Sequence, residues 1–162
     1  IVTATVDTLK GTYRFDTAWI VHDLANSIAP DIDSGQIEGA FAQGLGWSSL
    51  EELCFSSDGR LLSNTLSTYK VPDAHFMPEM IVKIVDTPNP HAVANSKAIG
   101  EPPFMYGIAG YFSVLDALRA ANPTGTLFFD LPMTPEKALR YLDNLVESPA
   151  TLKTHINIEE NQ

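Results

Sequence analysis

The spacing of hydrophobic side chains in this sequence changes from about two residues to about 3.6 residues along the chain. Residues 2–7 and 13–21 alternate apolar and polar side chains on either side of Gly11, which is typical of a β-hairpin with its turn near that glycine. Residues 31–46 instead follow a helical period. Their predicted buried face consists of Ile37, Ala40, Phe41, Gly44, Leu45 and, one turn further on, Ser48. A hairpin followed by a long helix indicates an α+β fold.

A second turn signal, Ser57-Asp58-Gly59, lies between residues 50–55 and 60–62 and predicts another hairpin. Residues 80–85 are rich in β-branched side chains and predict a strand. The sheet is therefore expected to draw on at least two parts of the chain.

Two further helices are predicted in the second half of the chain. Residues 105–121 are apolar on nearly every face, which favours a buried helix that ends at Asn122-Pro123. A final helix should begin with Thr134 as its N-cap and Pro135 in its first turn. The expected fold is thus α+β, with two hairpin-like β units and three helices.

The chain length of 162 residues is sufficient for one domain with a substantial core. We expect residues 1–147 to form it and residues 148–162 to be a polar C-terminal tail. The formal net charge of −10 argues against nucleic acid or an anionic membrane as a partner, because both need clusters of Lys and Arg. The hydrophobic content of 44% is that of a globular protein.

A single cysteine, Cys54, excludes an internal disulfide and an iron–sulfur site held by this chain alone, which needs about four cysteines. Between Leu53 and Phe55, it is expected to be a small core residue, compatible with a reducing cytoplasm. The four histidines lack the spacing of zinc ligands, so no metal-ligating side chains are predicted. His22 and Asp23 are interpreted as a structural pair.

The segment 96–104 places Glu101 between Gly100 and the dipeptide Pro102-Pro103, directly before the predicted apolar helix. The prolines fix their φ angles and stiffen the turn, so this carboxylate should be presented from a rigid backbone, as a general base requires. The spacing alone favours a structural role instead, because a Glu near a helix start is stabilised by the helix dipole.

The helix over residues 31–46 has a second stripe, formed by Gln36, Gly39, Gln43 and Gly46. Two amides and two glycines on one face would suit a buried, oxygen-rich anionic ligand. Alternatively, Asp33 and Gln36 could form a capping box while the glycines admit a neighbouring helix.

These segments resemble motifs of the molybdenum hydroxylases, the xanthine dehydrogenase and aldehyde oxidase family. Residues 96–104 resemble the active-site segment around the family's Gly-Glu-Pro-Pro motif. Residues 33–46 are similar to the family pattern G-Q-x-E-G-A-x-x-Q-G-L-G, and residues 67–72 to S-T-Y-K-[IV]-P. The likeness runs from about residue 2 to residue 142, and the xanthine dehydrogenase branch looks closest.

The resemblance implies that Glu101 is the catalytic base and that Gln36, Ile99 and Gly100 lie beside a molybdenum–molybdopterin cofactor. It implies oxidative hydroxylation with oxygen from water, Glu101 taking the proton from the molybdenum-bound hydroxyl. Lys97 would then be either a counter-charge for Glu101 or, as we expect, a surface lysine.

The resemblance also implies that the chain is the C-terminal part of a molybdopterin-binding domain and is inactive alone. Other segments or subunits would complete the cofactor site and carry [2Fe–2S] clusters and FAD in an oligomeric assembly. The expected substrate is a purine, hypoxanthine or xanthine. The alternatives are an aldehyde, another N-heterocycle, or an inactive interaction module that keeps the fold.

Overall fold

The computed structural model describes residues 1–126 and 129–144. Its sheet has the strand order β1 (Val2–Val6), β2 (Tyr13–Asp23) and β3 (Glu79–Val85). β1 and β2 are antiparallel and are joined through Gly11, whose φ of +69° suits a glycine, so the predicted hairpin is confirmed. β3 is the predicted strand. It pairs with β2 in parallel, an arrangement that requires a long connection between them.

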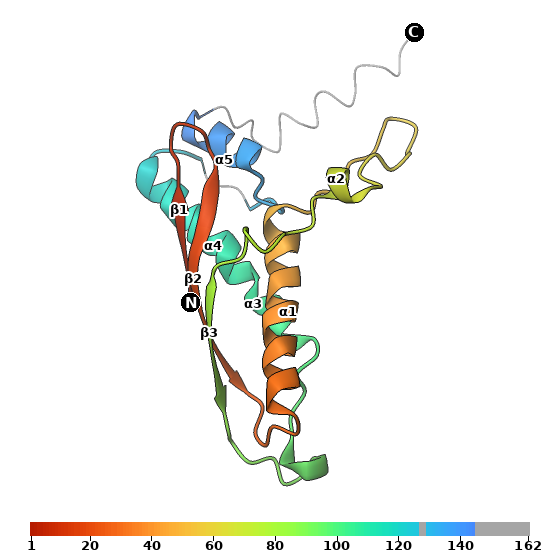
Figure 1. Ribbon diagram of the computed structural model, residues 1–162. Helices are drawn as coiled ribbons and strands as arrows, with labels where there is room; N and C mark the ends of the chain where they lie inside the picture. The colour runs from red at the N-terminus through yellow and green to blue at the C-terminus, as the bar shows by residue number, and fades with distance from the viewer. Residues whose placement is uncertain (127–128, 145–162) are drawn as a thin grey trace.

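The helices lie on one side of this sheet, with α1 the longest element of the molecule (Figure 1). Their bounds are α1 Pro30–Ser49, α2 Leu66–Tyr69, the 3₁₀ turn η1 Val93–Asn95, α3 Pro102–Tyr106, α4 Ile108–Ala121 and α5 Pro135–Leu142. The three longest, α1, α4 and α5, correspond to the three predicted helices.

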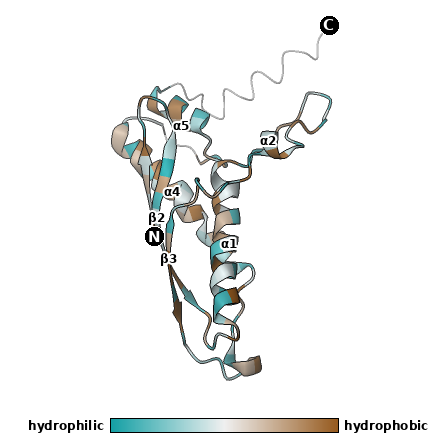
Figure 2. Cartoon of the chain, viewed as in Figure 1, coloured by the Kyte–Doolittle hydropathy of each residue, from teal (hydrophilic) through white to brown (hydrophobic). Residues whose placement is uncertain are grey.

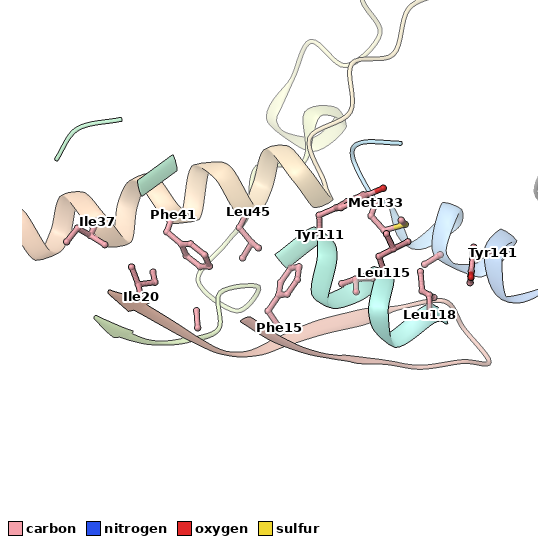
Figure 3. Close-up of a cluster of buried hydrophobic side chains, with 13 residues drawn as sticks. Phe15, Ile20, Ile37, Phe41, Leu45, Tyr111, Leu115, Leu118, Met133 and Tyr141 are labelled. Atoms are coloured by element: carbon pink, nitrogen blue, oxygen red, sulfur yellow. The ribbon is translucent and has the colours of Figure 1, made fainter. Parts of the chain in front are cut away.

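The core lies between the inner face of the sheet and helices α1 and α4 (Figure 3). The predicted buried face of α1 is confirmed, since all six of its residues are buried and Ile37, Phe41 and Leu45 are fully so. Each of these three side chains contributes about 1.5–3 kcal/mol by leaving water. Hydrophilic and hydrophobic residues are mixed along α1 (Figure 2).

The helix predicted over residues 105–121 is divided into α3 and α4 at Gly107. A Cβ at Gly107 would lie 2.2 Å from the carbonyl carbon of Gly44, so the two backbones touch at this point. Helix α4 ends as predicted, with Asn122 as its C-cap. Close packing against α1 therefore accompanies the break.

The segment between α1 and β3 departs from expectation. The predicted second hairpin is reduced to one bridge, Phe55 with Leu61, around a turn in which Gly59 has a φ of +81°. Cys54 was expected in the core but is exposed. Both differences have one cause, since this segment extends away from the sheet and helices, and none of the other described elements forms a second layer over it (Figure 1).

The last helix begins as predicted, because the Thr134 hydroxyl accepts a hydrogen bond from the backbone N–H of Lys137. The predicted polar tail, residues 148–162, lies outside the described residues. No helix in the described part of the chain is long and apolar enough to cross a membrane. The α+β fold class is confirmed.

Candidate active-site segment

Glu101 directly precedes α3, and Pro102 and Pro103 occupy the first turn of that helix as predicted. The backbone carbonyl of Glu101 accepts a hydrogen bond of 3.0 Å from Phe104 N–H, which closes the turn. The residue itself is exposed, and its carboxylate has no hydrogen-bonding partner among residues 1–126 and 129–144. A fixed backbone thus carries an accessible carboxylate.

The residues before Glu101 are held against the end of β2. Lys97 N–H donates a 3.0 Å hydrogen bond to Leu24 O, and Ala25 forms a bridge with Ser96. The side-chain amide of Asn26 donates to the carbonyl oxygen of Ala94 at 2.9 Å. The segment that leads into Glu101 is therefore anchored to the sheet before it reaches α3.

Backbone strain is concentrated in this anchor. Ala25, Ala94 and Asn95 have φ angles of 55°, 52° and 55°, in the left-handed region that favours glycine. For each of the two alanines this conformation costs about 1–2 kcal/mol, whereas asparagine adopts it more readily. Strain of this kind persists only where the surrounding structure imposes it, and it clusters at functional sites.

Lys97 contacts Asp23 and not Glu101. Its Nζ lies 2.5 Å from Asp23 Oδ2, and both side chains are partly exposed. This ion pair, assisted by the backbone N–H groups of Ala25 and Thr87, lowers the pKa of Asp23 to about 2. Lys97 is thus a partly exposed residue that fixes the segment to β2, and the counter-charge alternative is wrong.

His22 lies on the opposite face of β2 from Asp23 and does not pair with it. His22 is 4% exposed; its Nδ1 is 2.8 Å from the hydroxyl of Tyr106 and its Nε2 is 3.3 Å from the carbonyl oxygen of Ala98. The expected His22–Asp23 pair is therefore wrong, because neighbouring strand residues point to opposite faces. The inward position of a histidine in the alternating pattern of β2 was the signal for this contact.

Gln36 lies in the exposed part of α1, with Gly39 and Gln43 on the same stripe. A Cβ at Gly39 would meet no atom within 4 Å, whereas one at Gly46 would collide with Pro72. The stripe is therefore open at its first three positions and packed at its fourth. It offers amide groups beside an unobstructed backbone.

The capping box of Asp33 and Gln36, the alternative considered for this stripe, does not form, because α1 begins earlier, at Pro30. Instead, the Asp33 carboxylate accepts a 2.6 Å hydrogen bond from the Ser27 hydroxyl and a 3.3 Å bond from Ala29 N–H. The side chain of Gln36 has no such capping role.

Ile99 and Gly100 differ in their surroundings. The side chain of Ile99 is partly buried and packs against the core. Gly100 is exposed, and a Cβ there would meet no atom within 4 Å. Together with Glu101 they form one continuous strip of chain.

Helices α1 and α3 are in direct contact, which brings the two predicted motifs onto neighbouring elements. A Cβ at Gly44 would lie 1.9 Å from the carbonyl oxygen of Phe104, and the rings of Trp47 and Phe104 are 5.8 Å apart. Gln36 is eight residues before Gly44, or about 12 Å along the helix. No hydrogen bond joins Gln36 to Glu101 within the described residues.

The described residues contain no group of three or more His, Cys, Asp or Glu side chains that could hold a metal ion.

Comparison with known proteins identifies relatives of this chain. A family model described as a molybdopterin cofactor-binding domain matches residues 1–78. The chain is 40% identical over 148 residues to xanthine dehydrogenase of Dictyostelium discoideum and 41% identical over 140 residues to xanthine dehydrogenase/oxidase of Rattus norvegicus. These matches cover 87% and 82% of this chain but 11% and 10% of those proteins. The chain thus spans about a tenth of the length of these relatives.

The fold of this chain is also similar to that of a solved structure. The crystal structure of quinoline 2-oxidoreductase from Pseudomonas putida 86 matches 85% of this chain and 17% of that one, with a TM-score of 0.77 and 29% sequence identity. Sequence and fold therefore point to the same group of proteins. The chain is similar in sequence and in fold to molybdenum hydroxylases, and the relatives it matches include xanthine dehydrogenases.

Proposed function

We propose that this chain is part of the molybdopterin-binding domain of a molybdenum hydroxylase that oxidises a purine, hypoxanthine or xanthine, and that Glu101 is its general base. The observation that carries the proposal is the placement of Glu101. Its carboxylate is accessible, while Pro102 and Pro103 on one side and the anchor to β2 on the other fix its backbone. The sequence identity to xanthine dehydrogenases supports the purine as substrate.

The residues present fit a molybdopterin cofactor. Open space beside the backbone of Gly39 and Gly100 allows a large group to approach closely. The exposed amide of Gln36 can donate N–H groups to an oxygen-rich, anionic ligand without adding charge. We assign Gln36, Ile99 and Gly100 to the cofactor's surroundings, Ile99 through its backbone.

When bound, the molybdenum–molybdopterin cofactor would supply the two-electron oxidation. The oxygen that is added to the substrate comes from water, and it becomes an effective nucleophile only when it loses its proton. A carboxylate oxygen of Glu101 would accept that proton. The stiff turn at Pro102 keeps this oxygen at one position and so reduces the cost of reaching the reactive geometry.

Segments outside this chain would complete the proposed enzyme. The remaining nine tenths of the enzyme would cover Glu101, which is exposed in this chain, and would carry the [2Fe–2S] clusters and FAD. An oligomeric assembly in the cytoplasm is part of the proposal. Quinoline 2-oxidoreductase among the structural neighbours favours another N-heterocycle as the second candidate substrate.

The test is Glu101→Gln in the assembled enzyme, with Glu79→Gln as the matched control, because Glu79 is also an exposed Glu next to a strand or helix end. We expect hydroxylation by Glu101→Gln to fall by about 10²–10⁴-fold, with molybdenum content unchanged, and hydroxylation by Glu79→Gln to stay at the original level. Undiminished hydroxylation by Glu101→Gln would refute the base and favour an interaction module. Parallel assays with xanthine, quinoline and an aldehyde decide the substrate class.

A further inference from the structure

His22 is the one histidine among the buried polar residues of the described chain, and its position on β2 places it beneath the Glu101 segment. Its neighbours on the same strand face, Ala18 and Ile20, are buried and apolar. A buried imidazole in such surroundings needs partners for both ring nitrogens, because an unpaired polar group there costs about 1–3 kcal/mol. Both partners come from the segment that contains Glu101.

The chemistry of these partners determines the direction of both hydrogen bonds. The carbonyl oxygen of Ala98 can only accept, so Nε2 of His22 must carry the proton and donate to it across 3.3 Å. In the neutral ring Nδ1 is then an acceptor, and it receives the hydroxyl proton of Tyr106 across 2.8 Å. One side chain thereby contacts a carbonyl group before Glu101 and a hydroxyl group after it.

The two partners lie on either side of Glu101 along the chain, Ala98 before it and Tyr106 after it. Between them, apart from the bonds within helix α3 itself, the turn is closed by the backbone hydrogen bond from Phe104 N–H to Glu101 O. We infer that His22 is a positioning residue that holds both ends of the Glu101 turn on the sheet. The inference rests on the proposed function, since it gives this turn a catalytic carboxylate.

Catalysis should depend strongly on this contact, because a displacement of about 1 Å at a reacting group can cost about 100-fold in rate. The Lys97–Asp23 ion pair anchors the segment from the outer face of β2, and His22 anchors it from the inner face. Loss of His22 would leave the start of the turn attached but its backbone at Ala98 and its end at Tyr106 free to shift.

The experiment uses variants of the full-length assembled enzyme. His22→Leu removes both hydrogen bonds, whereas His22→Gln keeps an amide donor close to the position of Nε2. The matched control is His75→Leu, because His75 is exposed and no side-chain hydrogen bond is recorded for it in the described structure. For each variant we would measure kcat and KM, molybdenum content, and hydrogen–deuterium exchange of the backbone over residues 97–107.

We expect His22→Leu to lower kcat by about 10–100-fold, with KM changed less than about twofold and molybdenum content unchanged. The amides of Lys97 and Phe104 should exchange at least about tenfold faster than in the parent enzyme. His22→Gln should recover most of both losses, and His75→Leu should show neither.

Parent-like exchange and kcat in His22→Leu would overturn the inference, and so would equal losses in His22→Leu and His22→Gln, since a general packing defect has no reason to be rescued by an amide. Should His22→Leu fail to accumulate, Tyr106→Phe removes one of the two bonds and little volume, and parent-like exchange in it would also refute the inference. Faster exchange in His22→Leu together with full turnover by Glu101→Gln would overturn only the proposed function.

Discussion

At the scale of single residues, Asp23 and His22 show how adjacent positions of β2 serve the same segment from opposite faces. Asp23 lies on the outer face, where the ammonium group of Lys97 lowers its pKa to about 2. His22 lies on the inner face and contacts the backbone of Ala98. The alternation of side chains along a strand therefore allows both faces of the sheet to hold one short stretch of chain.

The Asp23–Lys97 pair predicts a pH dependence of stability. Because the pKa of Asp23 is lower in the folded chain than its ordinary value of 3.8, its contribution is present above about pH 4 and is lost as the pH falls towards 2. Lys97→Met should therefore reduce the free energy of unfolding at pH 6, and the difference from the parent should shrink at pH 2.5. Urea unfolding at both pH values measures this, with Lys83→Met as the control. A difference that is the same at both pH values would contradict the account.

At the scale of elements, the contact between α1 and the α3–α4 junction determines where the Glu101 turn lies. Gly44 and Gly107 allow the backbones to touch, and the hydroxyl of Ser48 donates to the carbonyl oxygen of Gly107 at 3.3 Å. The close approach leaves no room for a methyl group at either glycine. The packing of two helices thus positions a turn that belongs to neither.

This contact predicts opposite effects of the same substitution at two positions of α1. Gly44→Ala should lower the free energy of unfolding by about 1–3 kcal/mol, because its Cβ would lie 1.9 Å from the Phe104 carbonyl oxygen. Gly39→Ala should raise it by about 0.5–1 kcal/mol, because that position is helical and open. Denaturant unfolding of the two variants compares them directly. A stabilising Gly44→Ala would mean that the helices do not touch as described.

At the scale of the whole molecule, this chain exposes surfaces that are typical of an interface. Trp19, Val21 and Ile81 form an apolar patch on the outer face of the sheet, where Trp19 is paired directly with Ile81. The segment that carries Cys54 is also poorly covered, with Phe55 60% exposed. Contiguous apolar surface of this kind marks contact with other protein segments, in agreement with a chain that spans about a tenth of its relatives.

The proposal predicts the behaviour of the chain in isolation. The 162-residue chain, purified alone, should retain no molybdenum and should hydroxylate neither a purine nor an aldehyde. The physical reason is that one exposed strip and one open helix face provide only part of the contacts that a large cofactor needs. Elemental analysis measures the metal content. Molybdenum bound in proportion to the chain would show that these residues suffice.

Local patterns predicted the elements that depend on near neighbours in sequence. The hairpin around Gly11, the buried face of α1 and the Thr134 cap all follow from period or capping rules. Features that depend on distant contacts were not predictable in this way. The parallel pairing of β3, the break at Gly107 and the contact of Lys97 with Asp23 each require knowledge of which segments meet.

The candidate site likewise combines features that local sequence predicts with contacts that it does not predict. The prolines after Glu101 could be read directly from the sequence, and they form the first turn of α3. The roles of Glu101, Gln36, Ile99 and Gly100 came from resemblance to a family and stay predictions. His22 could have been suspected only as a polar residue at an inward position of β2, and its partners could not.

The most direct test of the general base is a crystal structure of the assembled enzyme with molybdopterin and a slowly reacting substrate. The account predicts that a carboxylate oxygen of Glu101 lies within hydrogen-bonding reach, about 2.6–3.2 Å, of the reacting group, and that the surrounding segments shield it from bulk water. A Glu101 carboxylate that points into solvent, or that lies far from the cofactor, would contradict it.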